Sequence, residues 1–426
     1  MEERRVLVVA LGTRGDVAPL LALANRLKAD GCAITIVTHA AHQHSLDWSG
    51  IECIRVPTDP SRRADAHGRT GDGGGSELAA EYAPVLALVR SARSRPDLIL
   101  FNLFALGVWH IADAFGIRCA AASPCLIPYA HPADFEDRFK AAHPALHRAL
   151  GGAGESQVGW EEVLHWMWPL WTERWATWRR ETLQAPEVPL VRVTSPSQLP
   201  PPTPLLYGFS PILVPPPPYW PASVRTTGFW HADLGVGELN RRDQYGADAP
   251  TALQVAVAGG RDATAWRHVI ATLRRHGGDC APIYVGFGSA SAHYIAEAAG
   301  SIGALVTAAA EVQSRGREVR SRCRTADGRT PLILHACGCA SIADAWASAI
   351  GEFVPALGDF EPDGAVSCAE VKGVTIVLVR GCLPLAALLP HCHVAVHHGG
   401  AGTCAAAAIA RTPQLVLPRL FDQVGS

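Results

Sequence analysis

Residues 394–410 read VAVHHGGAGTCAAAAIA, in which a short apolar run stops at two histidines and is followed by glycines, a threonine and a run of alanines. The β-branched start is typical of a buried strand, and the alanine-rich end is typical of a helix. Glycines between the two let the chain turn sharply and let a ligand approach the backbone amides. The stretch therefore predicts a strand, a tight turn and a helix, the repeating unit of an α/β protein.

The same alternation recurs along both halves of the chain. Near the amino terminus, RRVLVVALG (4–12) is followed by the helix-like DVAPLLALANRLKADG (16–31) and by AITIVTHA (33–40). In the second half, the apolar runs PIYVGFGS, PLILHACG, VTIVLVRG and TPQLVLP have the length of strands. Strands that alternate with helices predict an α/β fold with parallel sheets.

A proline-rich segment separates the two halves. Between Pro186 and Pro221 the density of prolines predicts neither a helix nor a central strand. Because shifts in composition mark domain boundaries, we place the change of domain after this segment. The predicted organisation is an amino-terminal domain over residues 1–226, a linker and extra segment over 227–281, and a carboxy-terminal domain over 282–426.

The composition excludes several classes of protein. Hydrophobic residues make up 48% of the chain and charged residues 18%, and the net charge is −2, so we expect no nucleic-acid partner. No run of about 20 apolar residues is present, which predicts a cytoplasmic protein. The twelve cysteines are scattered, and the close pair Cys337 and Cys339 has no second pair at zinc spacing, so we expect no metal site.

The turn after Val396 has the chemistry of an anion site. The first amides of a helix have no internal acceptors, and the helix dipole adds positive potential there. Thr403 could add a hydroxyl, and His398 or His397 could add a hydrogen bond or a charge. A glycine-rich packing turn with a core histidine is the alternative. The spacing is neither GxGxxG nor GxxxxGK[ST], so neither a dinucleotide fingerprint nor a P-loop is indicated.

Four blocks resemble one enzyme family. HHGGAGT followed by TPQLVLPRLFDQ is similar to the donor-binding signature of GT-B UDP-glycosyltransferases. GTRGDVAPLLALA (12–24), YGFSPILVPPPPYWPASVRTTGFW (207–230) and PIYVGFGS (282–289) resemble the sterol 3-beta-glucosyltransferase branch. The resemblance implies two Rossmann-like domains with parallel sheets that face each other across a cleft. The first would hold the acceptor and the second the UDP-sugar.

The resemblance also implies roles for individual residues. No metal is expected, in keeping with the lack of a DxD triplet, and no obligate protein partner is implied. The diphosphate would be contacted by His398, Gly400, Gly402 and Thr403 of the glycine-rich turn. The sugar hydroxyls would bond to Asp422 and Gln423 near the end of the chain, and the nucleotide would lie beside Ser289.

An inverting transfer needs a base for the acceptor hydroxyl. Asp16 is the sole carboxylate of the loop LGTRGDVAP, and it matches the position of the family's base or base-orienting carboxylate. The competing role is structural, because Asp16 could cap a helix that begins at Val17. Arg14 is either a surface charge or a partner that keeps Asp16 ionised. No histidine precedes Thr38, so the histidine base of many plant relatives is absent.

Tryptophans recur at helical spacing between Trp160 and Trp178. The simplest interpretation is a helix packed on the domain core. The functional alternative is an aromatic wall, which includes Trp168 and Trp171, for a lipophilic alcohol or a membrane surface.

Some stretches depart from the family pattern. Gly338 and Ala387 stand where the family has tryptophans, and Leu385 stands where it has a histidine. The sequence stops at Ser426, so the resemblance implies a carboxy-terminal domain that is truncated. These departures favour an inactive nucleotide-sugar or lipid-binding relative as the alternative to a hexosyltransferase. A transferase for a non-sterol aglycone is a third hypothesis.

Overall fold

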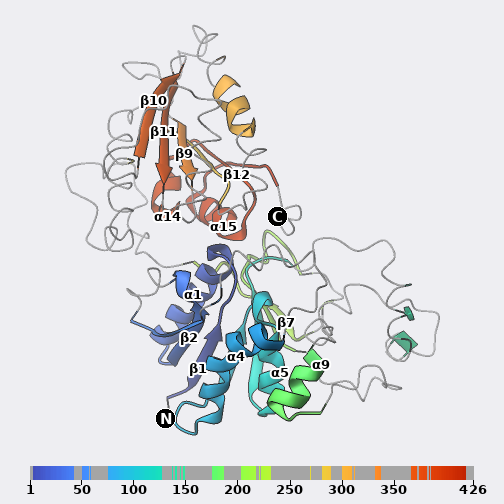
Figure 1. Cartoon of the computed structure of the whole chain (residues 1–426). Helices are drawn as coiled ribbons and strands as arrows, with labels where there is room; N and C mark the ends of the chain where they lie inside the picture. The colour runs from blue at the N-terminus through green and yellow to red at the C-terminus, as the bar shows by residue number, and fades with distance from the viewer. Residues whose placement is uncertain are drawn as a thin grey trace. The chain divides into compact units, whose positions relative to one another are not determined.

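The structure is a computed structural model. It describes residues 3–42, 50–56, 75–126, 175–186, 203–216, 222–231, 281–288, 300–308, 332–336, 366–371, 374–380 and 385–418, with single positions between them. The chain divides into two compact units, residues 1–232 and 233–424. Each unit is an α/β domain, as expected (Figure 1).

The amino-terminal unit is built on a seven-stranded sheet in the order β3-β2-β1-β4-β5-β6-β7, and every neighbouring pair is parallel. The order starts from a central β1 and runs outward in both directions, as in doubly wound folds. The strands are β1 (Arg5–Val9), β2 (Ala33–His39), β3 (Glu52–Val56), β4 (Leu98–Phe101), β5 (Arg118–Ser123), β6 (Leu205–Tyr207) and β7 (Val224–Thr226). The expectation that the proline-rich segment holds no central strand is wrong at β6, which pairs with strands on both sides over residues that include no proline.

Helices cover both faces of this sheet, which explains the unbroken apolar run in β1. Leu7 and Val9 belong to one core cluster, and Val6 and Val8 belong to another. Because successive side chains of a strand point to opposite faces, neighbouring residues of β1 are buried alternately by the helices on one face and by those on the other. The helices are α1 (Arg14–Ala29), α4 (Gly75–Arg90), α5 (Gly107–Ala114) and α9 (Trp175–Trp178), with the short turns η1 (Ala40–His42), η2 (Leu103–Ala105) and the π-helical η4 (Arg179–Leu183).

The start of α1 differs from the expectation. The helix begins at Arg14, three residues before Val17, with Thr13 at its N-cap. Asp16 therefore lies in the first turn and is not the N-cap residue. It still serves the helix end, because its carboxylate accepts a hydrogen bond from the backbone N–H of Thr13.

The tryptophan-rich stretch is described at its end, where α9 continues into η4 and stops at Gln184 in the left-handed conformation. Trp178 is buried and its ring lies 5.9 Å from that of Tyr82. At this position the core interpretation holds. Trp168 and Trp171 lie outside the described residues.

The carboxy-terminal unit contains a six-stranded sheet in the order β10-β11-β9-β8-β12-β13. All pairs are parallel except β10 with β11, so the expected parallel sheet carries one antiparallel edge strand. The elements are β8 (Ile283–Gly286), β9 (Leu332–Ala336), β10 (Val366–Val371), β11 (Val374–Arg380), α14 (Leu385–Leu388), η9 (Leu389–His391), β12 (Val394–His397), α15 (Ala401–Ala410) and β13 (Gln414–Val416).

Candidate functional site

The turn between β12 and α15 is supported by His397, the last residue of β12, whose side chain is fully buried. The backbone N–H of Gly399 donates to Nδ1 of His397 over 3.1 Å. The ring proton is therefore on Nε2, which donates to Oε1 of Gln414 over 2.9 Å. Burial lowers the pKa of His397, against the opposing effect of that bond. His397 thus supports the turn and ties β12 to β13, and it does not lie at the mouth of the turn.

His398 is enclosed by two glycines. Gly288 follows β8 and Gly400 caps α15, and a Cβ atom at either position would lie 2.6 Å from Cε1 or 2.5 Å from Nε2 of the His398 ring. The pairing of His397 with Gly286 brings the ends of β12 and β8 side by side, and Gly288 also has a φ of +67°. Glycine is therefore needed at Gly288 for both its backbone conformation and the space that His398 occupies.

His398 is neutral at pH 7. Burial, with a smaller contribution from His397, lowers its pKa to about 4, although a backbone hydrogen bond to Gly286 acts in the opposite direction. Its Nδ1 atom is buried and has no hydrogen-bond partner among the described residues. In the tautomer that has its proton on Nε2, Nδ1 carries a lone pair that can accept a hydrogen bond or take up a proton beside an anion.

The start of α15 is open to a ligand. Gly402 is exposed, and Gly400 and Thr403 are half-buried, so the turn is not sealed inside the protein. Gly400 is the N-cap residue, and no side chain caps this helix. The carbonyl of Gly400 accepts from the amides of Thr403 and Cys404. The amides that precede them are those that a helix start offers to an anion.

In the amino-terminal unit, the loop after β1 is organised around Gly12. Its φ is +105°, and a Cβ atom there would lie 2.8 Å from Oδ2 of Asp16. The same oxygen accepts from the backbone N–H and the hydroxyl of Thr13, each over 2.8 Å. Asp16 is half-buried and Arg14 is exposed, so the carboxylate lies at the surface edge of the loop.

Asn102 fixes the base of this loop from the end of β4. Its side chain is buried and bonds both backbone groups of Leu11, accepting from the N–H over 3.2 Å and donating to the carbonyl over 2.6 Å. It also reaches the carbonyl of Asp16. One amide side chain thus replaces the strand pairing that Leu11 lacks.

Two histidines at the end of β2 bond to the same loop, and sequence reasoning missed them. Nε2 of His39 accepts from the N–H of Gly12 over 3.0 Å, and Nε2 of His42 lies 2.9 Å from the carbonyl of Gly12. The signal in the sequence is that these histidines directly follow the second strand, as the loop follows the first. The two strands are parallel with Val9 opposite Val37, and that register places His39 beside the residues that follow Val9.

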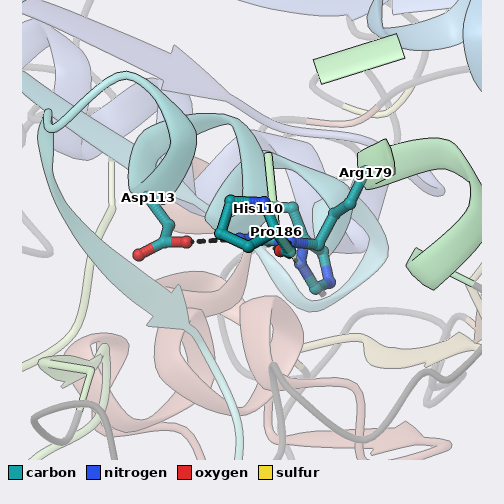
Figure 2. Close-up of polar contacts among 4 residues, drawn as sticks. All are labelled: His110, Asp113, Arg179 and Pro186. Carbon is teal, nitrogen blue, oxygen red and sulfur yellow. Dashed lines mark hydrogen bonds and ion pairs between the residues drawn. The ribbon is translucent and has the colours of Figure 1, made fainter. Parts of the chain in front are cut away.

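A second polar cluster joins α5 to the end of the tryptophan-rich segment (Figure 2). The buried guanidinium of Arg179 pairs with Asp113 over 2.7 Å and donates to Nδ1 of His110 and to the carbonyl of Pro186. Burial, and secondarily the charge of Arg179, lower the pKa of His110 to about 3. The partners satisfy the buried cation, so the cluster acts as a structural clamp.

Three of the predicted donor-side residues, Ser289, Asp422 and Gln423, lie outside the described residues, as does Gly338. Ala387 is described, and it is buried in the core of the carboxy-terminal unit. Within the described part of the chain, no group of three or more metal-binding side chains gathers. None of the helices described is long and apolar enough to cross a membrane.

Two family models match the chain. Residues 6–71 match the glycosyltransferase family 28 N-terminal domain, and residues 371–425 match the erythromycin biosynthesis protein CIII-like C-terminal domain. The sterol 3-beta-glucosyltransferase of Neosartorya fischeri is 25% identical over 99% of this chain, and that of Debaryomyces hansenii is 24% identical over 98%. The chain spans only 25% and 22% of these two relatives.

Solved structures show the same fold at low identity. Arabidopsis thaliana UGT89C1 complexed with UDP-L-rhamnose has a TM-score of 0.51 and 17% identity, with 99% of this chain and 81% of that chain covered. The spinosyn forosaminyltransferase SpnP has a TM-score of 0.50 and 15% identity, with 99% and 82% covered. The likeness shows a GT-B fold, and the two domain matches, in this order, show that the chain is similar to glycosyltransferases at both of its ends, with sterol 3-beta-glucosyltransferases among its relatives.

Proposed function

We propose that the chain transfers a hexose, glucose in the first instance, from a UDP-sugar to the hydroxyl of a lipophilic, sterol-like acceptor with inversion at the anomeric carbon. The observation that carries the proposal is the turn from His397 to Thr403, where an uncapped helix start lies beside an enclosed, neutral histidine. The sterol-like acceptor and the glucose donor are proposed by analogy with the relatives, which are sterol 3-beta-glucosyltransferases.

The donor end of the proposal rests on the chemistry of this turn. A diphosphate at the start of α15 would receive hydrogen bonds from backbone amides and from the hydroxyl of Thr403. Gly402 has no side chain to obstruct the approach, and nothing lies within 4 Å of the position that a Cβ atom would take there. Nδ1 of His398 would meet a donor hydroxyl or share a proton with the diphosphate. Ser289, Asp422 and Gln423 would complete the site around the nucleotide and sugar.

The acceptor end rests on Gly12, Thr13 and the first turn of α1, at the carboxyl edge of the sheet, where ligands bind in open α/β folds. Asp16 is the proposed base or base-orienting carboxylate, with Arg14 in the same helical turn. Trp168 and Trp171 are the proposed aromatic contacts of the acceptor or of a membrane surface. Because backbone amides neutralise the leaving diphosphate in this scheme, transfer should not need a divalent metal.

The runner-up is a binding protein without turnover. It is favoured by Ala387, which the core of the carboxy-terminal unit buries where the family has a tryptophan. A transferase for another aglycone is a weaker candidate, and the acceptor panel below also tests it.

The test is to incubate the protein with UDP-glucose and a panel of sterols and polyketide alcohols, with and without EDTA, and to detect glycoside by mass spectrometry. Asp16→Asn and His398→Ala are the matched variants, and UDP binding is measured by calorimetry. Glycoside from the wild type, lost in both variants and retained in EDTA, supports the proposal. Tight UDP binding without glycoside or donor hydrolysis supports the binding protein instead.

A further inference from the structure

His42 lies at the loop that the proposed function assigns to the acceptor. It ends η1, directly after β2, and its half-buried ring contacts the carbonyl of Gly12 through Nε2 at 2.9 Å. Oδ2 of Asp16 borders the same glycine, since a Cβ atom at Gly12 would lie 2.8 Å from it. An imidazole and a carboxylate from different elements therefore meet at one residue.

The bond to Gly12 fixes the tautomer of His42. A carbonyl oxygen can only accept, so Nε2 of His42 must carry the proton and donate it. The neutral ring then has its lone pair on Nδ1. A histidine whose one nitrogen donates to a carbonyl and whose other nitrogen is basic has the arrangement of a general base with a backbone orienter.

The charged groups around His42 favour the neutral ring. Burial lowers its pKa below 6.5, and the charge of Arg14 on α1 lowers it further, against the opposing bond to Gly12. The His39 ring on β2 lies 6.1 Å away, and its Nε2 accepts the N–H of Gly12. Asp16 lies across Gly12 and is the acidic group at this loop. At pH 7 the ring is therefore able to accept a proton.

Asp16 is less suited to that step, because Oδ2 is committed to Thr13. It accepts from both the N–H and the hydroxyl of Thr13, which fixes the loop at the start of α1. This geometry gives Asp16 the part of a positioning residue, which shapes the loop around Gly12.

We infer that Nδ1 of His42 takes the proton of the acceptor hydroxyl, an inference that rests on the proposed function. As the acceptor oxygen bonds to the anomeric carbon, its O–H bond breaks and the proton passes to Nδ1. The bond from the anomeric carbon to the diphosphate oxygen breaks with its electron pair, and UDP leaves. The imidazolium formed is stabilised by the Gly12 carbonyl at Nε2, and it returns the proton to water.

The test uses His42→Gln, because the glutamine amide can still donate to Gly12 but offers no basic atom. His393→Gln is the control, since His393 is exposed and lies before β12, at the end of that strand away from the glycine-rich turn. We expect kcat to fall about 100-fold or more in His42→Gln, with Tm and UDP affinity close to wild type. In the wild type, kcat/KM should fall as pH drops below the range in which His42 is neutral, and this limb should disappear in the variant.

A purely structural role would leave His42→Gln with wild-type kcat and the same pH limb, and that result overturns the inference. Should His42→Gln unfold, His42→Ala decides: rescue of transfer by added imidazole supports the proton transfer, and lack of rescue overturns it. If wild type binds UDP but gives no glycoside with any acceptor, the proposed transferase falls, and His42's role with it. If the wild type gives glycoside and the His42 variants behave as the wild type does, only the role of His42 falls and the proposed transferase stands.

Discussion

Gly288 and His398 pack together where two parallel strands end, and a Cβ atom on Gly288 would lie 2.6 Å from Cε1 of His398. Gly288 belongs to the turn after β8, and His398 belongs to the turn after β12. The two turns therefore cannot move independently, and the histidine orientation depends on a residue more than a hundred positions away in the chain.

Gly288→Ala should weaken both folding and UDP binding. The alanine methyl would collide with His398, and the residue would keep a positive φ, so we expect a loss of about 2–4 kcal/mol in the free energy of unfolding. Gly300→Ala is the control, because a Cβ atom there meets nothing within 4 Å. Chemical denaturation and calorimetry with UDP measure the two effects. Equal stability and affinity in both variants would contradict this packing.

Gly402→Ala should separate stability from binding. Gly402 lies in the first turn of α15 with open space around it, so alanine should stabilise the helix by about 0.5–1 kcal/mol. If a diphosphate approaches the amides of this turn, the added methyl should raise the Kd for UDP several-fold. Calorimetry and thermal melting decide the matter. Unchanged affinity together with a higher Tm would mean that the ligand does not approach the turn at Gly402.

Much of the fold was accessible from the sequence because the strands are unbroken apolar runs. Strands that are buried on both faces are nearly continuous apolar runs, so composition alone predicts them; examples are Val6 to Val9 and Val374 to Val379. β10 was missed because VSCAEV mixes polar and apolar residues. It pairs with β11 across the two positions between Val371 and Val374, and the KG dipeptide there was an unused hairpin signal.

The candidate site was less accessible, because it depends on register. The glycine-rich turn is local in sequence and was found there. His42 reaches Gly12 only through the pairing of β1 with β2, and Gly288 reaches His398 only through the pairing of β8 with β12. The sequence allows Asp16 to cap a helix from Val17, whereas α1 begins at Arg14 because Thr13 and Asp16 cap it together.

Asn102→Leu should release the loop after β1. The side chain of Asn102 satisfies both backbone groups of Leu11, and leucine would leave these buried groups without their partner. The expected loss is about 2–4 kcal/mol in unfolding free energy, with a larger KM for the acceptor and little change in UDP affinity. Asn102→Asp retains the acceptor for the Leu11 N–H but sets a carboxylate oxygen against the Leu11 carbonyl, so it should lose stability as well. A KM that is unchanged in both variants would show that the loop does not depend on Asn102.

The His110 clamp predicts how stability depends on pH. Its folded pKa of about 3 lies below the unfolded value of 6.5. Between these values the unfolded chain binds a proton that the folded chain does not, so stability is fully present above pH 6.5 and is lost as pH falls toward 3. The slope from this one group is at most about 1.4 kcal/mol per pH unit.

His110→Asn isolates that contribution. The Oδ1 atom of asparagine can replace Nδ1 as the acceptor for Arg179, whereas the amide does not titrate. Guanidinium unfolding at pH 7.5, 6, 5 and 4 should show the wild type losing stability relative to His110→Asn as the pH falls below 6.5, with a constant difference above it. Because His398 and the carboxylates titrate in both proteins, their effects cancel in this comparison. Parallel stability curves over the whole range would mean that His110 has the same pKa in the folded and the unfolded chain, which would contradict its burial beside Arg179 as the cause of a lowered pKa.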